Sequence, residues 1–332
     1  MKRLFSLASA AVALVFGWYV LQGANGGKLP TIPFLFPTAA SSTSTDPPVR
    51  AVDSIRVASF NIQVFGEQKI ANPDAMPVIV EVLRNFDVIA VQEIRSQQDI
   101  LPRLMDMLNA GGQFHYDYVI GPRLGRSVSK EQYAFIFDRA TIEVDRAQLY
   151  TIDDPDDLMH REPLIGWFRA RAGNPAFTFS LVNVHTDPDE VDRELEVLDD
   201  VFYAVRDDSR QEDDVIMLGD FNANDTHLGQ LGQIPGLAWV VSNTPTNTRH
   251  TAQYDNILFH RTATSEFTGR GGVFDFLRQY NLSMEQALAV SDHVPVWAEF
   301  SVFEGGQAGH LATRPVAPPA SIPAPPPATR EY

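Results

Sequence analysis

The 332-residue sequence contains no cysteine. Thiolate catalysis, disulfide bridges and zinc or iron–sulfur sites built on cysteine are therefore excluded. The same absence removes the usual indicator of redox compartment, because no thiol has to be kept reduced or oxidised.

Basic residues are also scarce. The chain has 26 Lys and Arg against 42 Asp and Glu, which gives a formal net charge of -16. This balance argues against a protein that coats nucleic acid through a broad positive field, although it leaves room for a locally basic cleft. A surplus of carboxylates also suits a site that holds a hard divalent cation. Hydrophobic residues make up 44% of the chain, which is enough for a substantial globular core.

A long uncharged hydrophobic run occurs at the N-terminus. Residues 4–21, "LFSLASAAVALVFGWYVL", follow the basic pair Lys2 and Arg3. This pattern is typical of either a signal peptide or an uncleaved membrane anchor. The poor cleavage signal and the interfacial Trp18 and Tyr19 favour the anchor. Either segment predicts a protein that is secreted, periplasmic or membrane-anchored, with its catalytic domain outside the cytoplasm.

The composition divides the chain into four parts. Residues 1–22 form the signal peptide or anchor, 23–53 a Pro-, Ser- and Thr-rich linker, 54–302 a single domain, and 303–332 a Pro- and Ala-rich disordered tail. Inside the domain, short apolar runs alternate with helical patterns, which predicts an α/β class. The expected strands are 55–60, 87–92, 133–138, 177–184, 214–219, 254–259 and 294–300. The expected helices are 77–84, 100–109 and 190–206.

Polar side chains stand at one end of six of these strands. The stretch "LGDFNAN" is an example, because the apolar run before it leads directly into Asp220 and Asn222. The remaining members of the set are Asn61, Glu93, His185, Asp255, Asp292 and His293. Turn chemistry explains one or two such residues, but histidines and a glutamate in the same role indicate a functional crevice at the edge of a sheet.

These residue types point to metal-assisted chemistry with proton transfer. Asn61, Glu93 and Asp292 offer hard oxygen ligands that suit magnesium, manganese or calcium, whereas zinc would require more imidazole or thiolate. His185 and His293 suit proton transfer to and from a developing phosphate charge.

The order of motifs resembles the endonuclease/exonuclease/phosphatase superfamily, and within it the deoxyribonuclease I-like branch. The matching strings are "SFNIQVFG", "DVIAVQEIR", "LGRSVSKEQYAFIF", "REPLIGWF", "LVNVHT", "MLGDFNAN", "AQYDNILF" and "SDHVPVW". Each string alone is weak, but eight in the right order are strong evidence. The resemblance implies a four-layer α/β sandwich of two packed mixed β-sheets flanked by helices, and hydrolysis of phosphodiester bonds by water.

The resemblance also implies roles for individual residues. Glu93, with Asn61 and Asp292, would hold Mg²⁺ or Mn²⁺, and a structural Ca²⁺ ion is expected in addition. His185 and His293 would be the general acid/base pair. Glu131 and Asp255 would orient their imidazoles, Asp220 would position or activate the water, and Asn222 would bind the scissile phosphate.

DNA is the expected substrate, and the protein is expected to act as a monomer. Arg95 resembles the arginine of the branch that enters the minor groove, and Arg126, Lys130, Arg161 and Tyr254 lie on segments expected to meet the substrate. Ser129 is a departure, because the branch has a groove-stacking tyrosine there. The sequence also departs from the branch in having no cysteines for the branch's disulfides, so its stability must come from packing or from bound calcium.

Two other functions remain open on the sequence alone. The same fold supports phosphodiesterases and phosphatases that act on sphingolipid or inositol phosphates, and a membrane-directed N-terminus would suit them. A catalytically silent binding module would be indicated by loss of Glu93 or either histidine, but all three are present.

Overall fold

The computed structural model describes residues 53–126 and 130–305. The predicted anchor or signal peptide, nearly all of the predicted linker, Ser129 and most of the predicted tail lie outside the described residues. Within the described part of the chain, no helix has both the length and the hydrophobicity needed to cross a bilayer.

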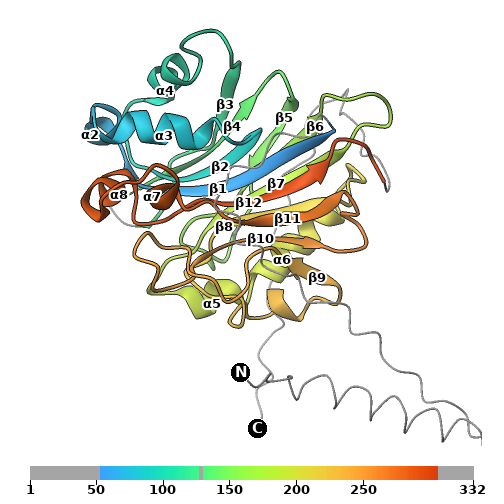
Figure 1. The fold of residues 1–332 in the computed structure, drawn as a ribbon. Helices are drawn as coiled ribbons and strands as arrows, with labels where there is room; N and C mark the ends of the chain where they lie inside the picture. The colour runs from blue at the N-terminus through green and yellow to red at the C-terminus, as the bar shows by residue number, and fades with distance from the viewer. Residues whose placement is uncertain (1–52, 127–129, 306–332) are drawn as a thin grey trace, which may run out of the picture. The chain divides into compact units, whose positions relative to one another are not determined.

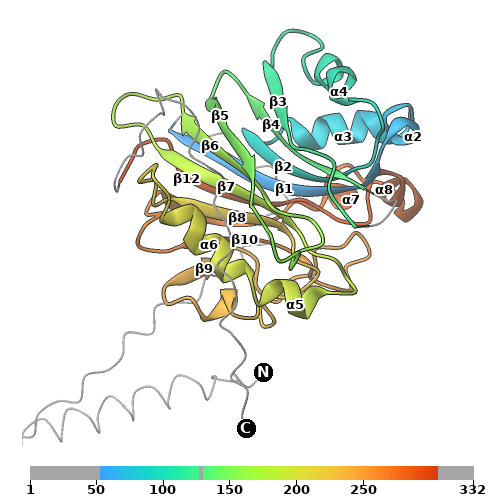
Figure 2. The same ribbon diagram turned by 180° about the vertical axis from the view of Figure 1, so that it is seen from behind.

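Two six-stranded mixed sheets pack face to face, and helices cover their outer faces (Figures 1 and 2). In spatial order, the first sheet consists of β11 (Phe267–Val273), β12 (Val296–Ser301), β1 (Ser54–Phe65), β2 (Val88–Ile94), β4 (Gln132–Asp138) and β3 (Tyr116–Ile120). The second consists of β5 (Ile142–Thr151), β6 (Leu164–Ala170), β7 (Thr178–His185), β8 (Val215–Asp220), β10 (Asp255–His260) and β9 (Leu237–Trp239). The predicted four-layer sandwich is confirmed.

The helices lie in two groups, one for each sheet. Residues on the first group share a hydrophobic cluster with β1, β2 and β4: α2 (Glu67–Ile70), α3 (Ala75–Leu83), α4 (Leu101–Leu108), α7 (Phe276–Gln279) and α8 (Met284–Val290). The second group packs on β7 and β8: α5 (Val191–Leu195), α6 (Leu198–Arg206) and the 3₁₀ helix η2 (Leu231–Gln233).

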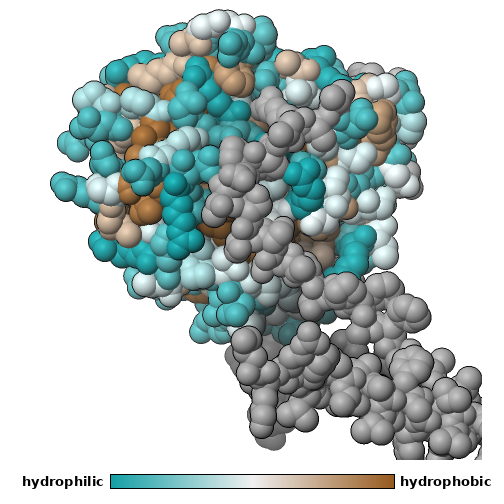
Figure 3. Space-filling model, viewed as in Figure 1, coloured by the Kyte–Doolittle hydropathy of each residue, from teal (hydrophilic) through white to brown (hydrophobic). Residues whose placement is uncertain are grey.

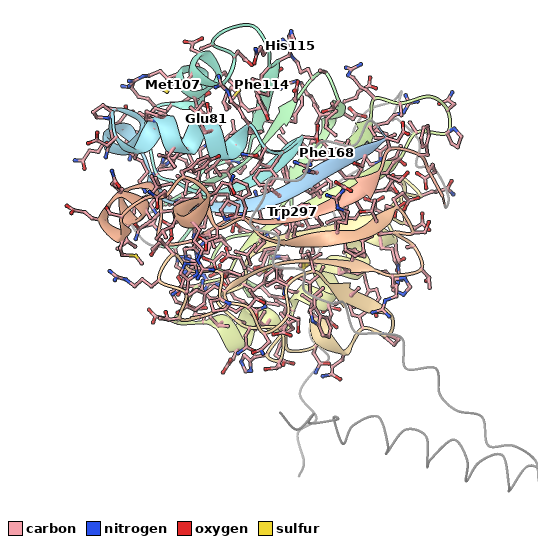
Figure 4. The ribbon with its side chains drawn as sticks, in the orientation of Figure 1. Glu81, Met107, Phe114, His115, Phe168 and Trp297 are labelled. Carbon is pink, nitrogen blue, oxygen red and sulfur yellow. The ribbon has the colours of Figure 1, made fainter. Side chains whose placement is uncertain are left out.

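The central core lies between the two sheets and is rich in phenylalanine. Phe168 of β6 is fully buried there, with ring centroids 5.2 Å from Phe135 and 5.8 Å from Phe179 (Figure 4). Strands such as β1 and β2 are covered on both faces, so nearly every residue along them is buried. On the outer surface, Figure 3 shows mainly hydrophilic side chains outside the grey atoms, with apolar residues in small separate areas.

The seven predicted strands are all present. One predicted helix is divided in two, and the structure contains five further strands that were not predicted. The helix expected over 190–206 is two helices, α5 and α6, separated at Glu196 and Val197. The buried Glu194 carboxylate accepts hydrogen bonds from the backbone N–H groups of His160 and Asp187, and this contact orients α5 separately from α6. Strands β3, β5, β6, β9 and β11 were not predicted, because charged residues or glycines interrupt most of them.

Strand direction brings six polar strand ends to one edge of the sandwich. Strands β1 and β2 run parallel to each other, as do β7 and β8, so the C-terminal ends of each pair lie together. Strands β12 and β10 run antiparallel to β1 and β8, and therefore begin where those strands end. In the second sheet, Asp220 is directly paired with His185 on one side and with Asp255 on the other. We call this edge of both sheets the catalytic rim.

Candidate active site

The first element of the catalytic rim is a buried histidine–carboxylate pair. His185 Nδ1 lies 2.6 Å from Glu131 Oε1, and both side chains are almost completely buried. The contact leaves His185 Nε2 facing Asp220, at 3.6 Å from Oδ2. Arg161 lies beneath the pair, where its guanidinium donates to the His185 carbonyl oxygen at 3.1 Å and lies 3.2 Å from Glu131. These contacts fix the orientation of the imidazole.

A second pair of the same kind faces the first. His293 Nδ1 lies 2.9 Å from Asp255 Oδ2, and His293 Nε2 lies 3.5 Å from Asp220 Oδ2. The buried Thr246 hydroxyl donates to the same Asp255 oxygen at 2.7 Å. That hydroxyl also accepts from the backbone N–H of Asp255, which holds the carboxylate against its strand.

Asp220 Oδ2 is therefore the point on which both histidines converge. It also accepts a hydrogen bond from Asn61 Nδ2 at 3.0 Å, and Asp220 Oδ1 accepts one from the backbone N–H of Asn222 at 2.9 Å. Two imidazoles and a carboxylate at this spacing can remove a proton from one oxygen and supply a proton to another.

The stretch "LGDFNAN" owes its composition to this geometry. Gly219 has φ +152° and packs against β7, so closely that an added Cβ would lie 1.9 Å from the Val184 carbonyl oxygen. Phe221 is fully buried in the core beneath the second sheet. Asn222 has φ +48°, a conformation that asparagine tolerates, and its side chain donates to the Thr186 carbonyl oxygen at 2.8 Å. Glycine and asparagine thus permit a sharp turn directly after Asp220.

The electrostatics of the first pair favour an ion pair. Burial opposes the charged form of Glu131, but His185, Arg161 and Arg95 together lower the pKa of this carboxyl. Burial also opposes a charge on His185, yet Glu131 and Asp220 raise the pKa of the imidazole. In the second pair, burial opposes a charge on His293, but the nearby carboxylates Asp255 and Asp220 outweigh this effect and raise the pKa of the imidazole.

The residues predicted to hold a metal lie beside these pairs. Asn61 Nδ2 contacts Glu93 Oε1 at 3.2 Å, and Asp292 accepts from Gln63 Nε2 at 2.9 Å. Asn61 Oδ1 and Asp292 Oδ1 are both buried without a hydrogen-bond partner, which is costly unless a cation or water satisfies them. Two unpaired hard oxygens next to the Glu93 carboxylate fit a divalent cation such as Mg²⁺.

Glu93 reaches this position through an irregular backbone. It has φ +62°, and the pairing of β2 with β4 shifts register between Val91 and Ile94. A bulge of this kind redirects a side chain at the end of a strand. The Glu93 carboxylate then accepts from the backbone N–H of Val64 at 2.8 Å, which links β2 to the similarly irregular end of β1.

The basic residues predicted to contact the substrate occupy different environments. Arg95 is partly exposed at the rim, where its guanidinium lies 3.1 Å from Glu93 and 3.4 Å from Glu131. Arg161 is buried, so it supports His185 from below rather than standing at the surface. Arg126 forms ion pairs with Asp157 at 3.0 Å and with Glu190 at 2.7 Å.

Tyr254, the aromatic residue predicted to contact the substrate, lies against the second pair. Its ring centroid is 5.7 Å from that of His293. Its backbone N–H donates to the Thr246 hydroxyl at 2.9 Å, which places it on the same support as Asp255.

Several supporting residues were not identified from the sequence. Gln92 Nε2 donates to Asn183 Oδ1 at 2.6 Å and joins the two sheets one layer beneath the rim. The Ser291 hydroxyl donates to the Asn61 carbonyl oxygen at 2.7 Å and accepts from the backbone N–H of His293. With Thr246, these are neutral polar residues inside apolar runs or loops, and only their buried contacts reveal their role.

Lys69 of α2 was also not identified from the sequence. Its ammonium donates to the Val290 carbonyl oxygen at 2.9 Å. Burial lowers its pKa to about 8, although Asp292 and Glu93 act in the opposite direction. It adds a positive charge near the residues that fit a metal.

Two facing sheets with paired histidines and carboxylates at one rim define the class of the protein as a phosphoesterase-type sandwich. The chain belongs to the endonuclease/exonuclease/phosphatase family, whose model matches residues 58–293. Within the family it falls in the deoxyribonuclease I-like branch.

Individual relatives agree with this placement. The chain is 36% identical to deoxyribonuclease gamma of Rattus norvegicus over 260 residues, which cover 73% of this chain and 83% of the relative. It is 31% identical to deoxyribonuclease-1 of Bos taurus, covering 73% of this chain and 91% of the relative. The solved structure of an endonuclease/exonuclease/phosphatase from Bacteroides vulgatus has the same fold, with a TM-score of 0.52, 14% identity, and coverage of 75% of this chain and 99% of that chain.

Proposed function

We propose that this protein is a divalent-metal-dependent endonuclease that hydrolyses DNA phosphodiester bonds with low sequence specificity. The observation that carries the proposal is the convergence of His185 Nε2 and His293 Nε2 on Asp220 Oδ2, at 3.6 and 3.5 Å. Each histidine has its own buried carboxylate partner, which holds the ring in place during proton transfer.

Hydrolysis at this rim requires one proton to leave the attacking water and another to reach the departing oxygen. The two imidazoles can supply the base and the acid, while Asp220 orients the water between them. The Nδ1 atoms of the two rings are occupied by their contacts with Glu131 and Asp255. Proton transfer to and from the substrate is therefore confined to the two Nε2 atoms. Asn61, Glu93 and Asp292 would hold the cation, and a bound Mg²⁺ or Mn²⁺ would supply positive charge that stabilises the phosphate in the transition state.

DNA as the substrate is supported by the relatives, which carry the name deoxyribonuclease. Arg95 at the rim is placed to attract a phosphodiester backbone, although the net charge of -16 predicts weak binding far from the rim. We further propose that the protein is exported, on the basis of the hydrophobic residues 4–21. It would then be either released from the membrane or anchored to it by that segment. We also propose that it acts as a monomer.

A plasmid-nicking assay of the full chain tests this function. We expect conversion of supercoiled to open-circular DNA in Mg²⁺ or Mn²⁺, and no conversion in EDTA. Sphingomyelin and inositol phosphates serve as competing substrates in parallel reactions. Hydrolysis of sphingomyelin or of inositol phosphates, without nicking of the plasmid, would instead assign the protein a phosphodiesterase or phosphatase activity on those substrates. Inactivity on DNA, sphingomyelin and inositol phosphates alike would indicate a binding module.

The metal requirement leads to a specific prediction for Glu93. The substitution Glu93→Gln keeps the shape of the side chain but removes the charge that a hard cation requires. We expect the Mg²⁺ concentration for half-maximal nicking to rise by roughly tenfold or more, because loss of a charged ligand weakens the site. Glu285→Gln, which neutralises an exposed carboxylate on α8, is the matched control. Superimposable Mg²⁺ titrations for wild type and Glu93→Gln would exclude Glu93 as a ligand.

A further inference from the structure

A second group of carboxylates lies at the opposite edge of the sandwich from the catalytic rim. Asp214 precedes β8, Glu266 precedes β11, and Glu304 follows β12. Oxygen atoms of these three side chains lie within 4.8 Å of one another. Asp214 and Asp220 are separated by the length of β8, which is about 20 Å at the usual rise of a strand. We call Asp214, Glu266 and Glu304 the distal carboxylate cluster.

Two members of the cluster, Asp214 and Glu266, are buried, and three of their four carboxylate oxygens lack hydrogen-bond partners. Asp214 is completely inaccessible to solvent and Glu266 is 4% exposed. Neither Asp214 oxygen accepts a hydrogen bond of normal geometry, and Glu266 Oε2 also lacks a partner. A buried carboxylate whose oxygens lack well-formed hydrogen bonds is costly, so a cation bound at Asp214 would stabilise it.

The charges around Asp214 have the same sign. Burial, followed by the charges of Glu266, Glu212 and Glu304, raises the pKa of Asp214 to about 10. Burial raises the pKa of Glu212 to about 7, although this carboxylate accepts a hydrogen bond from Trp167 Nε1 at 3.0 Å. Among the residues that the structure describes, neither Asp214 nor Glu266 has an ion-pair partner at 4 Å or less.

We propose that the distal carboxylate cluster binds a divalent cation, with Ca²⁺ as the best chemical match. All the donors are carboxylate oxygens, with no imidazole or thiolate among them, which favours a hard cation. The donors come from three separate segments, and such irregular sites suit the flexible coordination of Ca²⁺ better than the strict octahedron of Mg²⁺. This proposal is independent of the proposed nuclease activity.

The site would join the end of the domain to both sheets. Glu304 accepts from the backbone N–H of Thr178, at the start of β7, at 3.1 Å, and Glu266 accepts from the backbone N–H of Gly305. A cation held by Glu304, Glu266 and Asp214 would tie the segment after β12 of the first sheet to β8 of the second. We therefore expect the cation to increase stability rather than to take part in catalysis.

Thermal unfolding of the full chain, stripped of metal with EDTA and then titrated with CaCl₂, tests the site. In the Glu93→Gln background, which weakens the metal site at the catalytic rim, Ca²⁺ at about 100 times its Kd is expected to raise Tm by roughly 5–10 °C. Glu266→Gln and Glu304→Gln should each raise the Ca²⁺ concentration for half of this shift at least tenfold. Glu285→Gln, with the same loss of charge on the exposed face of α8, should leave the titration unchanged.

The glutamine variants are expected to fold. Removing one negative charge reduces the repulsion on Asp214, so their metal-free Tm should equal or exceed that of the parent protein. A Ca²⁺ titration that is the same in the parent and in both glutamine variants would overturn the proposal.

Terbium luminescence provides a second readout that does not depend on stability. Tb³⁺ binds at sites lined by oxygen ligands. Trp167 donates a hydrogen bond to Glu212, which lies beside Asp214, so this tryptophan is placed to sensitise Tb³⁺ emission from the cluster. We expect Tb³⁺ emission on excitation of tryptophan, and we expect added Ca²⁺ to lower this emission by displacing the Tb³⁺ ion. Trp167→Phe and Glu266→Gln should each reduce the emission severalfold. Emission that is insensitive to both substitutions would place the bound ion elsewhere and contradict the proposal. Nicking activity in Mg²⁺ should be unchanged by Glu266→Gln, so a failure of either proposal can be told from a failure of the other.

Discussion

Replacement of His185 or His293 by alanine is expected to reduce DNA nicking by on the order of 10²-fold or more, the usual range for loss of a general acid or base. Each ring presents its Nε2 to Asp220 and is held by a buried carboxylate at its Nδ1, and alanine has no ring nitrogen that can give or accept a proton at this position. The fold should survive in His185→Ala, because Arg161 and Arg95 still face the Glu131 charge.

Nicking rates and circular dichroism spectra of the purified variants measure this effect. The matched control is His227→Ala, because His227 also pairs with a carboxylate, Asp192 at 2.7 Å, but this pair is exposed to solvent. His293→Gln provides a second variant that keeps a polar side chain beside Asp255. Near-normal nicking by a folded His185 or His293 variant would remove that histidine from the mechanism.

The substitution Gly219→Ala is expected to produce the largest loss of stability. An added Cβ would lie 1.9 Å from the Val184 carbonyl oxygen and 2.9 Å from the Val184 nitrogen, so β8 would have to move away from β7. The positive φ of +152° adds strain that only glycine avoids. We expect a loss of about 4 kcal/mol or more in the free energy of unfolding, because both the backbone and the packing must change.

Denaturant unfolding of Gly219→Ala and of a control glycine variant separates the two causes. Gly269 also has a positive φ, +81°, but an added Cβ there would meet nothing within 4 Å. Gly269→Ala should therefore cost only about 1 kcal/mol, from backbone conformation alone. Equal losses in the two variants would show that close packing of β8 against β7 is not what requires glycine at position 219.

Much of the fold could be predicted from the sequence because most of its buried strands contain short apolar runs. Strands β1, β2, β7 and β8 are covered on both faces, so their sequences stand out from the polar segments around them. Strand β11, "FTGRGGV", could not be predicted in this way, because it lies at the edge of the first sheet and most of its residues are exposed or partly exposed. The break between α5 and α6 escaped prediction for a different reason, since it depends on contacts of Glu194 with residues outside the helix.

The division is similar at the catalytic rim. The chemical types of its residues could be predicted, because carboxylates, amides and histidines that end apolar strands are visible in one dimension. Thr246, Ser291 and Asn183 could not, because a neutral polar residue acquires its role only from the partner that it meets after folding. Arg161 shows the same limit, since its segment was expected at the substrate while its guanidinium lies buried beneath His185.

The sequence by itself determined most of the strands that form the buried centre of this protein, β6 being the exception, and which reactive groups stand at their ends, because burial and local chemistry depend on residue type. Only the tertiary structure decided that these ends meet. Parallel pairing of β7 with β8 and antiparallel pairing of β8 with β10 set His185, Asp220 and Asp255 side by side. The length of β8 separates Asp214 from Asp220, and the packing of the two sheets places Asp214 with Glu266 and Glu304 at the other edge. Contacts between residues this far apart in the chain depend on strand direction and register, which local sequence patterns do not encode.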